Sequence, residues 1–180
     1  WCDGHPELME FTRDGVAGHC LNPLKHLADG RLYEDVFAEQ LTVVLRDYGF
    51  DGYHAADGFS SPRQPIWMAD FSDDMVGQFV ALMGVTLPAR YAGPATGTAA
   101  TTARADYLWN HHRQLWCEFY ARRFEQFFAK VCRAVHAVGG QVCYNNAWTR
   151  DPFEAYYRYG VDYHRIARAG VDRFLVETVG

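Results

Sequence analysis

The sequence predicts an α/β protein with a parallel sheet, and more narrowly a partial (β/α)8 TIM barrel with a long helical insertion. Amphipathic helical segments alternate along the chain with short apolar runs typical of buried strands. The joints Tyr48–Asp51 and Ala169–Asp172 share one design, in which glycine ends a helix and an apolar residue and Asp lead into a strand. A complete barrel needs eight strands and about 250 residues, so we expect about three or four βα units. A doubly wound α/β domain is the alternative.

The first half of the chain is predicted to hold two helices and one strand. Residues 1–30 show little periodicity and are punctuated by Gly and Pro, so we expect a long loop there. A helix is predicted over Leu32–Tyr48, where apolar residues recur every three or four positions. Residues 50–56 are predicted to form a short strand. After a turn-rich loop, Ser72 is the expected N-cap of a helix that runs to about Met83.

The second half is predicted to hold one very long helix and two more strands. Residues 85–101, rich in Ala, Thr, Gly and Pro, are expected to form a loop within an insertion between strands. Residues 102–138 contain neither Pro nor Gly and trace one apolar helix face. Strands are predicted at 141–145 and 173–178. Between them, Asp151–Glu154 has the pattern of a helix start, with Asp as N-cap and Pro in the first turn.

Composition excludes several classes of partner. The chain has 17 basic and 22 acidic residues, hence a net charge of −5 and no basic excess for a nucleic-acid backbone. No apolar run approaches the ~20 residues of a membrane-spanning helix. The glycine-rich phosphate-binding motifs of nucleotide sites are missing. We therefore expect no nucleic-acid partner and no membrane partner.

Cysteine usage predicts the cellular compartment, and the two ends of the chain predict whether it is a fragment. The five cysteines have irregular spacing and form no C-x-x-C pair, which favours reduced thiols and a cytoplasmic location. The chain starts at Trp1 and stops directly after a predicted strand, so we expect it to be a fragment of one larger barrel domain. Its targeting and its oligomeric state therefore stay undetermined.

No metal or cofactor site is expected. His111 and His112 are neighbours on the long helix and point about 100° apart, so they cannot bind one ion as an i, i+4 pair. The cysteines and histidines have no zinc-like spacing either.

Polar and aromatic residues gather where the three predicted strands end, which is where α/β proteins place their chemistry. The candidates are Tyr53, His54 and Asp57 at the first strand, Asn145, Asn146, Trp148 and Arg150 at the second, and Glu177 at the third. Aromatic faces stack on sugar rings, while amides and carboxylates pair with hydroxyl groups. This mixture indicates a carbohydrate site.

Cleavage of a glycosidic bond needs two carboxyl groups, and their separation decides between retention and inversion. Asp57 and Glu177 are the catalytic candidates, because they follow different strands at the same edge of the sheet. Structural alternatives exist for both residues. Asp57 precedes Gly58 and is also suited to capping a turn, and Glu177 is also suited to an ion pair with Arg150.

Three segments carry a resemblance to a known group of enzymes. Leu21–Leu27, Tyr48–Gly58 and Tyr144–Pro152 resemble (β/α)8-barrel glycoside hydrolases and their uncharacterised bacterial relatives. The resemblance covers most of residues 20–180. It implies an eight-stranded barrel whose catalytic carboxylates lie at strand ends.

One departure from that group concerns the end of the second predicted strand. Many retaining members carry an Asn-Glu pair at the end of strand four, whereas Asn146 is followed here by Ala147. Either Asp57 or Glu177 then takes a catalytic role, or the second carboxylate lies outside this chain. A barrel that binds sugar without cleaving it is the third possibility.

The leading hypothesis is therefore a glycoside hydrolase that acts on a carbohydrate with Glu177 and Asp57, without a cofactor. The expected substrate-binding residues are Tyr53, His54, Asn145, Asn146, Trp148 and Arg150. One alternative is another barrel enzyme, such as a lyase, an isomerase or a metal-dependent hydrolase, in which His54 and Asp57 bind a metal or act as base. The other is a non-catalytic carbohydrate-binding barrel.

Overall fold

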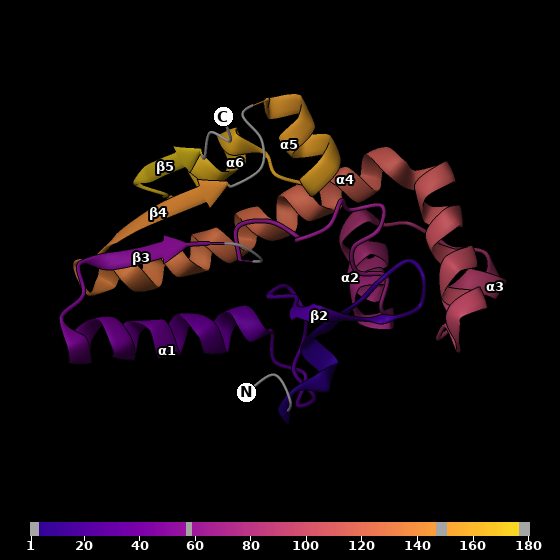
Figure 1. Cartoon of the computed structure of the whole chain (residues 1–180), viewed down its shortest axis with the longest axis horizontal. Coiled ribbons are helices and arrows are strands. Elements are labelled where there is room, and N and C mark those ends of the chain that lie inside the picture. Colours follow the sequence, from indigo (N-terminus) through magenta and orange to yellow (C-terminus); the bar gives the residue numbers. More distant parts are fainter. Residues whose placement is uncertain (1–3, 57–58, 147–150, 177–180) are drawn as a thin grey trace.

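A computed structural model describes residues 4–56, 59–146 and 151–176 of the chain (Figure 1). The elements in chain order are η2 (Pro6–Leu8), β1 (Met9–Phe11), β2 (Ala17–Leu21), α1 (Tyr33–Tyr48), β3 (Gly52–Ala55), α2 (Asp73–Met83), α3 (Ala89–Ala92), α4 (Thr98–Ala137), β4 (Gln141–Asn146), α5 (Pro152–Tyr159), α6 (Tyr163–Arg168) and β5 (Arg173–Val176). The protein is thus a mixed α/β structure, as the sequence predicts.

The three predicted strands form one parallel sheet. Its order is β3-β4-β5, so strands that follow one another in the chain are neighbours in space (Figure 1). Helical crossovers join them, as parallel strands require. Within the described residues this sheet is open, and no barrel is closed.

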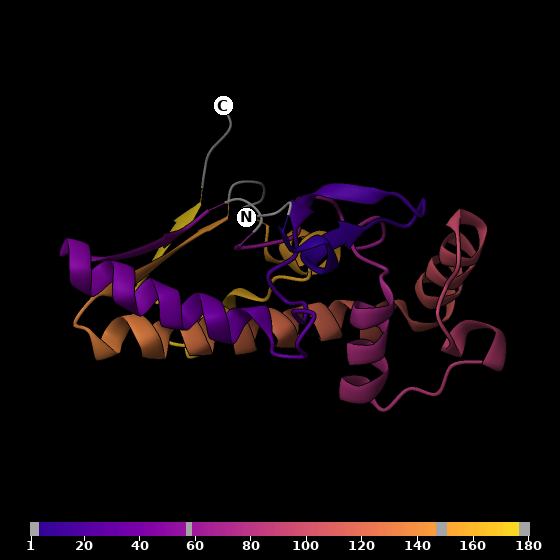
Figure 2. The ribbon, with the colours of Figure 1, turned by 90° about the horizontal axis from the view of Figure 1, so that it is seen from below.

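Helices α1 and α4 lie on the same side of this sheet (Figure 2). Ala55, Val142 and Tyr144 have no exposed surface and belong to the core with these helices. A buried ion pair joins the two helices, because Arg123 Nη2 lies 2.9 Å from Glu34 Oε2. The core therefore occupies one face of the sheet.

The local helix signals in the sequence are confirmed. Ser72 accepts a hydrogen bond from the Met75 backbone N–H, and Asp151 accepts one from the Glu154 backbone N–H. Gly49 ends α1 in the left-handed conformation, which glycine adopts without steric penalty. These signals are reliable because each cap bond spans only a few residues.

The prediction of a long loop over residues 1–30 is wrong. This segment contains a short 3₁₀ helix and the antiparallel hairpin of β1 and β2. The hairpin strands are short and their pairing is irregular, which hides the usual alternation of apolar and polar residues. A distant segment supports the hairpin, since the Phe71 N–H donates to the Phe11 carbonyl oxygen at 2.7 Å.

The long helix also differs from the prediction. Helix α4 begins at Thr98 inside the predicted loop 85–101, which in addition contains α3. It is broken at His112, where φ is −132° and ψ is 21°. Neither Pro nor Gly marks this break in the sequence. None of the helices in the described ranges is both long and apolar enough to cross a bilayer.

Candidate functional site

The end of the parallel sheet brings two of the predicted binding residues to one face. His54 is paired in register with Cys143, and Asn145 with Leu175. Side chains alternate between the two faces along a strand, so these residues lie opposite the helix-facing Tyr144. His54 is exposed, whereas Asn145 is only 5% exposed. His54 and Asn145 therefore occupy the face that α1 and α4 leave uncovered.

The neighbouring residues Tyr53 and Asn146 lie on the opposite, helix-facing side. Asn146 is fully buried, and its Nδ2 donates to the Tyr163 hydroxyl of α6 at 2.8 Å. The Tyr53 ring contacts Phe37 of α1 edge to face. Burial raises the pKa of the Tyr53 hydroxyl well above its ordinary value. In this arrangement both side chains connect the sheet to its helices.

Four predicted site residues, Asp57, Trp148, Arg150 and Glu177, lie outside the described residues. In the sequence Asp57 comes two positions after β3, and Glu177 directly follows β5. The described ends of β3 and β5 are separated by β4, which amounts to two strand spacings, or about 10 Å.

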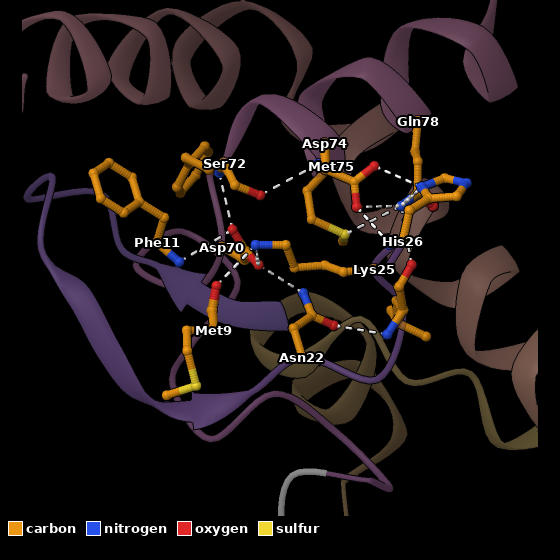
Figure 3. A network of polar contacts seen from close by, with 12 residues as sticks. Met9, Phe11, Asn22, Lys25, His26, Asp70, Ser72, Asp74, Met75 and Gln78 are labelled. Atoms are coloured by element: carbon orange, nitrogen blue, oxygen red, sulfur yellow. Dashed lines mark hydrogen bonds and ion pairs between the residues drawn. The ribbon is translucent and has the colours of Figure 1, made fainter. Parts of the chain in front are cut away.

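A second polar cluster surrounds Asp70, which has no exposed surface. Its carboxylate accepts hydrogen bonds from the Phe11 N–H at 3.2 Å, Asn22 Nδ2 at 2.9 Å and the Ser72 N–H at 2.9 Å. Lys25 Nζ lies 3.7 Å from the same carboxylate and donates to a backbone carbonyl of β1. Figure 3 shows how Asp70 thereby joins the hairpin, the loop before α1 and the start of α2.

Glu10 lies on β1 beside this cluster and lines a cavity of about 250 Å³, together with Lys25. The residue is only 6% exposed. Burial raises the pKa of its carboxyl group to about 7, and the charge of Asp70 adds to this rise, while Lys25 and Arg63 oppose it. A carboxyl group with a pKa near neutrality is suited to both donating and accepting a proton.

The sequence does not single out Glu10, because residues 1–30 lack the periodicity that predicts a strand. The available signal is local: Glu10 stands between Met9 and Phe11 in a short stretch that otherwise suits a strand. The charged residues that affect its pKa include distant ones, and Asp70 lies sixty positions away in the sequence. Such a pair gives no pattern of spacing.

The part of the chain that the structure describes contains no ready-made metal-binding site. No three His, Cys, Asp or Glu side chains of the described ranges come together as ligands. His26 is occupied by Asp74, since its Nδ1 lies 2.7 Å from Asp74 Oδ1 (Figure 3). A metal bound by His54 and Asp57 stays a prediction, because Asp57 lies outside the described ranges.

The buried cysteines are not activated nucleophiles. Burial raises the pKa of the Cys117 thiol to about 11 and that of the Cys132 thiol to about 12. Both thiols are therefore neutral at physiological pH, whereas the thiolate is the reactive form.

Comparison of the chain with protein-family models, with curated proteins and with solved structures finds no match. The fold and the geometry of its polar clusters are therefore the basis for a functional hypothesis.

Proposed function

We propose that this chain forms part of a (β/α)8-barrel hydrolase that cleaves O-glycosidic bonds with paired carboxyl groups. The observation that carries the proposal is the sheet order β3-β4-β5, parallel and consecutive in the chain. With α1 and α4 on one side of the sheet, this order matches successive βα units of a barrel wall. The uncovered face then corresponds to the barrel interior.

The proposal assigns catalysis to Asp57 and Glu177. They follow the two strands that flank β4, and a glycosidase needs one carboxyl group as acid and one as nucleophile or base. His54 and Asn145, which share the uncovered face, would bind hydroxyl groups of the sugar. Trp148 and Arg150 are the further binding residues of the proposal.

The experiment measures hydrolysis of a panel of chromogenic glycosides by the protein and by Glu177→Gln and Asp57→Asn. Both variants are isosteric and remove the acid or the nucleophile, so kcat is expected to fall by about two to four orders of magnitude. Glu154→Gln is the matched control, because Glu154 lies on the surface of α5 and pairs only with Arg158 among the described residues. Its turnover should stay within about threefold of wild type.

Turnover of Glu177→Gln close to that of the control variant would exclude a catalytic role for Glu177. A wild-type protein that binds sugars but hydrolyses none of the panel would favour the non-catalytic barrel.

A second candidate function is a proton-transfer enzyme, either a lyase or an isomerase. Glu10 favours it, because its near-neutral pKa and its place in a cavity beside Lys25 suit a general base. The same variants separate the two candidates. An activity that is lost in Glu10→Gln and retained in Glu177→Gln would indicate proton transfer at the hairpin.

A further inference from the structure

A large cavity lies where α4 is broken. Its volume is about 830 Å³, within the usual range of small-molecule sites. Its wall includes His111, His112 and Arg113 from α4 and Phe153, Tyr156 and Tyr157 from α5. The cavity therefore lies between the inserted helix and the helix that follows β4.

Phe153 and Tyr157 line the cavity, and Trp67 and Trp109 pack against Tyr157; we call these four residues the aromatic platform. The rings of Phe153 and Tyr157 are nearly parallel, at an angle of 7° and a centroid distance of 5.7 Å. Tyr157 also contacts Trp67 at 5.8 Å and Trp109 at 5.7 Å. Phe153 is 72% exposed. Tyr157 is half-buried, so Phe153 is the ring of this pair that is suited to stacking against the apolar face of a ligand ring.

Two segments that follow strands β3 and β4 hold the aromatic platform in place. Trp67 lies in the segment after β3, and α5 follows β4. The Ile66 backbone N–H donates to the Arg158 carbonyl oxygen at 2.8 Å, which ties these two segments together. The platform is thereby built from segments that leave the carboxyl end of the sheet.

A positive charge lies directly beside the aromatic platform. Arg113 is the one permanently charged residue among those described that line the cavity. Its Nη1 donates to the Tyr157 hydroxyl at 3.3 Å, and its guanidinium lies 5.5 Å from the centre of the Trp109 ring. No carboxylate of the described ranges lies within ion-pair distance of Arg113, although the protein carries a net charge of −5.

The nearby titratable groups do not cancel this charge. Glu118 accepts from the Tyr156 hydroxyl at 3.4 Å, but its carboxylate is paired with Arg122 and Arg165 at 2.7 Å each. His112 Nε2 is buried without a hydrogen-bond partner in the described part of the chain. The cavity thus combines an unneutralised cation, an unpartnered ring nitrogen in its wall and an aromatic surface.

We propose that this cavity binds an anionic sugar ring, such as a hexuronic acid unit of an acidic glycan. The apolar face of the sugar stacks on Phe153, and its carboxylate pairs with the Arg113 guanidinium. A carboxylate and a guanidinium form two parallel charge-assisted hydrogen bonds, which gives selectivity for the acid over a neutral sugar. The choice of a sugar as the ring rests on the proposed function, whereas the site itself rests on the contacts above.

The test is calorimetric titration of the full chain with three ligands. They are a short oligogalacturonate, the neutral galactose oligomer of equal length, and phenylacetate as an aromatic acid. The oligogalacturonate is expected to bind about tenfold or more tightly than the neutral oligomer, with an affinity that falls as salt is added.

Two substitutions and one control define the site. Arg113→Gln should remove the preference for the acidic oligomer and leave weak binding to both oligomers. Tyr157→Phe keeps the ring and removes the hydroxyl that Arg113 contacts, so its preference should shrink while stacking persists. Arg133→Gln, an exposed arginine on the same helix, should behave as wild type.

Equal affinity for the acidic and the neutral oligomer would overturn the proposal, and so would an unchanged acid preference in Arg113→Gln. Binding of phenylacetate alone would show that the site takes aromatic acids and not sugars. Glycosidase activity is measured on the same preparations. Hydrolysis of neutral glycosides without binding of oligogalacturonate would contradict only the anionic-sugar site. Selective binding of oligogalacturonate without any hydrolysis would contradict only the proposed glycosidase activity.

Discussion

Glu10 shows how one buried carboxyl group links stability to pH. Burial raises its pKa from the ordinary 4.5 to about 7, so the folded protein binds this proton more tightly than the unfolded chain does. Its contribution to stability is complete below about pH 4.5 and is lost as the pH rises through 7. The deprotonated group then destabilises the folded state by on the order of 3 kcal/mol.

Glu10→Gln tests this directly, because glutamine mimics the protonated carboxyl group at every pH. The variant is expected to be more stable than wild type at pH 8 and similar at pH 4, measured as the free energy of unfolding in urea. Glu154→Gln changes an exposed ion pair, so its free energy of unfolding should equal that of wild type at both pH values. A stability difference that stays constant between the two pH values would contradict the raised pKa of Glu10.

Individual residues were predictable where their partners are close in sequence. Ser72 and Asp151 cap helices through bonds to residues three positions away, and both appear in the sequence as N-cap patterns. Asp70 is different, because it bonds the Phe11 N–H across 59 positions. The candidate site at the hairpin depends on such long-range pairs, which leave no pattern of spacing in the sequence, and only the place of Glu10 between Met9 and Phe11 hints at it.

At the scale of elements, the parallel sheet was predictable and the break in α4 was not. Strands β3, β4 and β5 lie within two residues of their predicted positions, since each begins shortly after a glycine that follows the end of a helix. The break at His112 has no Pro or Gly to mark it. Phe71 stacks on Trp116, four residues after the break, from outside the helix. Tertiary packing of this kind is not encoded in helix periodicity.

The packing of α5 on α4 can be tested at Gly160, the left-handed residue that ends α5. A Cβ atom at Gly160 would lie 2.2 Å from Tyr120 Cβ, whereas a Cβ atom at Gly84 would meet nothing within 4 Å. The two glycines have nearly equal φ angles of 65° and 64°, so Gly84→Ala measures the backbone strain alone.

Gly84→Ala is expected to lower the free energy of unfolding by about 1 kcal/mol. Gly160→Ala should lower it by about 1–3 kcal/mol more, because α5 must move away from Tyr120. Urea denaturation of both variants gives the two values. Equal losses in the two variants would mean that α5 does not pack against α4 at this position.

For the whole molecule, the open sheet predicts self-association. Strands β3 and β5 each have one hydrogen-bonded neighbour in the described sheet, and Leu175 on β5 is 45% exposed on the uncovered face. An edge strand with unpaired backbone groups and exposed apolar side chains pairs readily with another chain. Sedimentation velocity of the 180-residue chain is therefore expected to show dimers or larger species that increase with concentration.

Leu175→Lys places a charge on this edge strand and should shift the chain toward monomer. Val16→Lys, at an exposed position of the hairpin, should leave the association unchanged. A wild-type chain that stays monomeric at all concentrations and melts cooperatively would contradict the proposal that these three strands are part of a larger barrel.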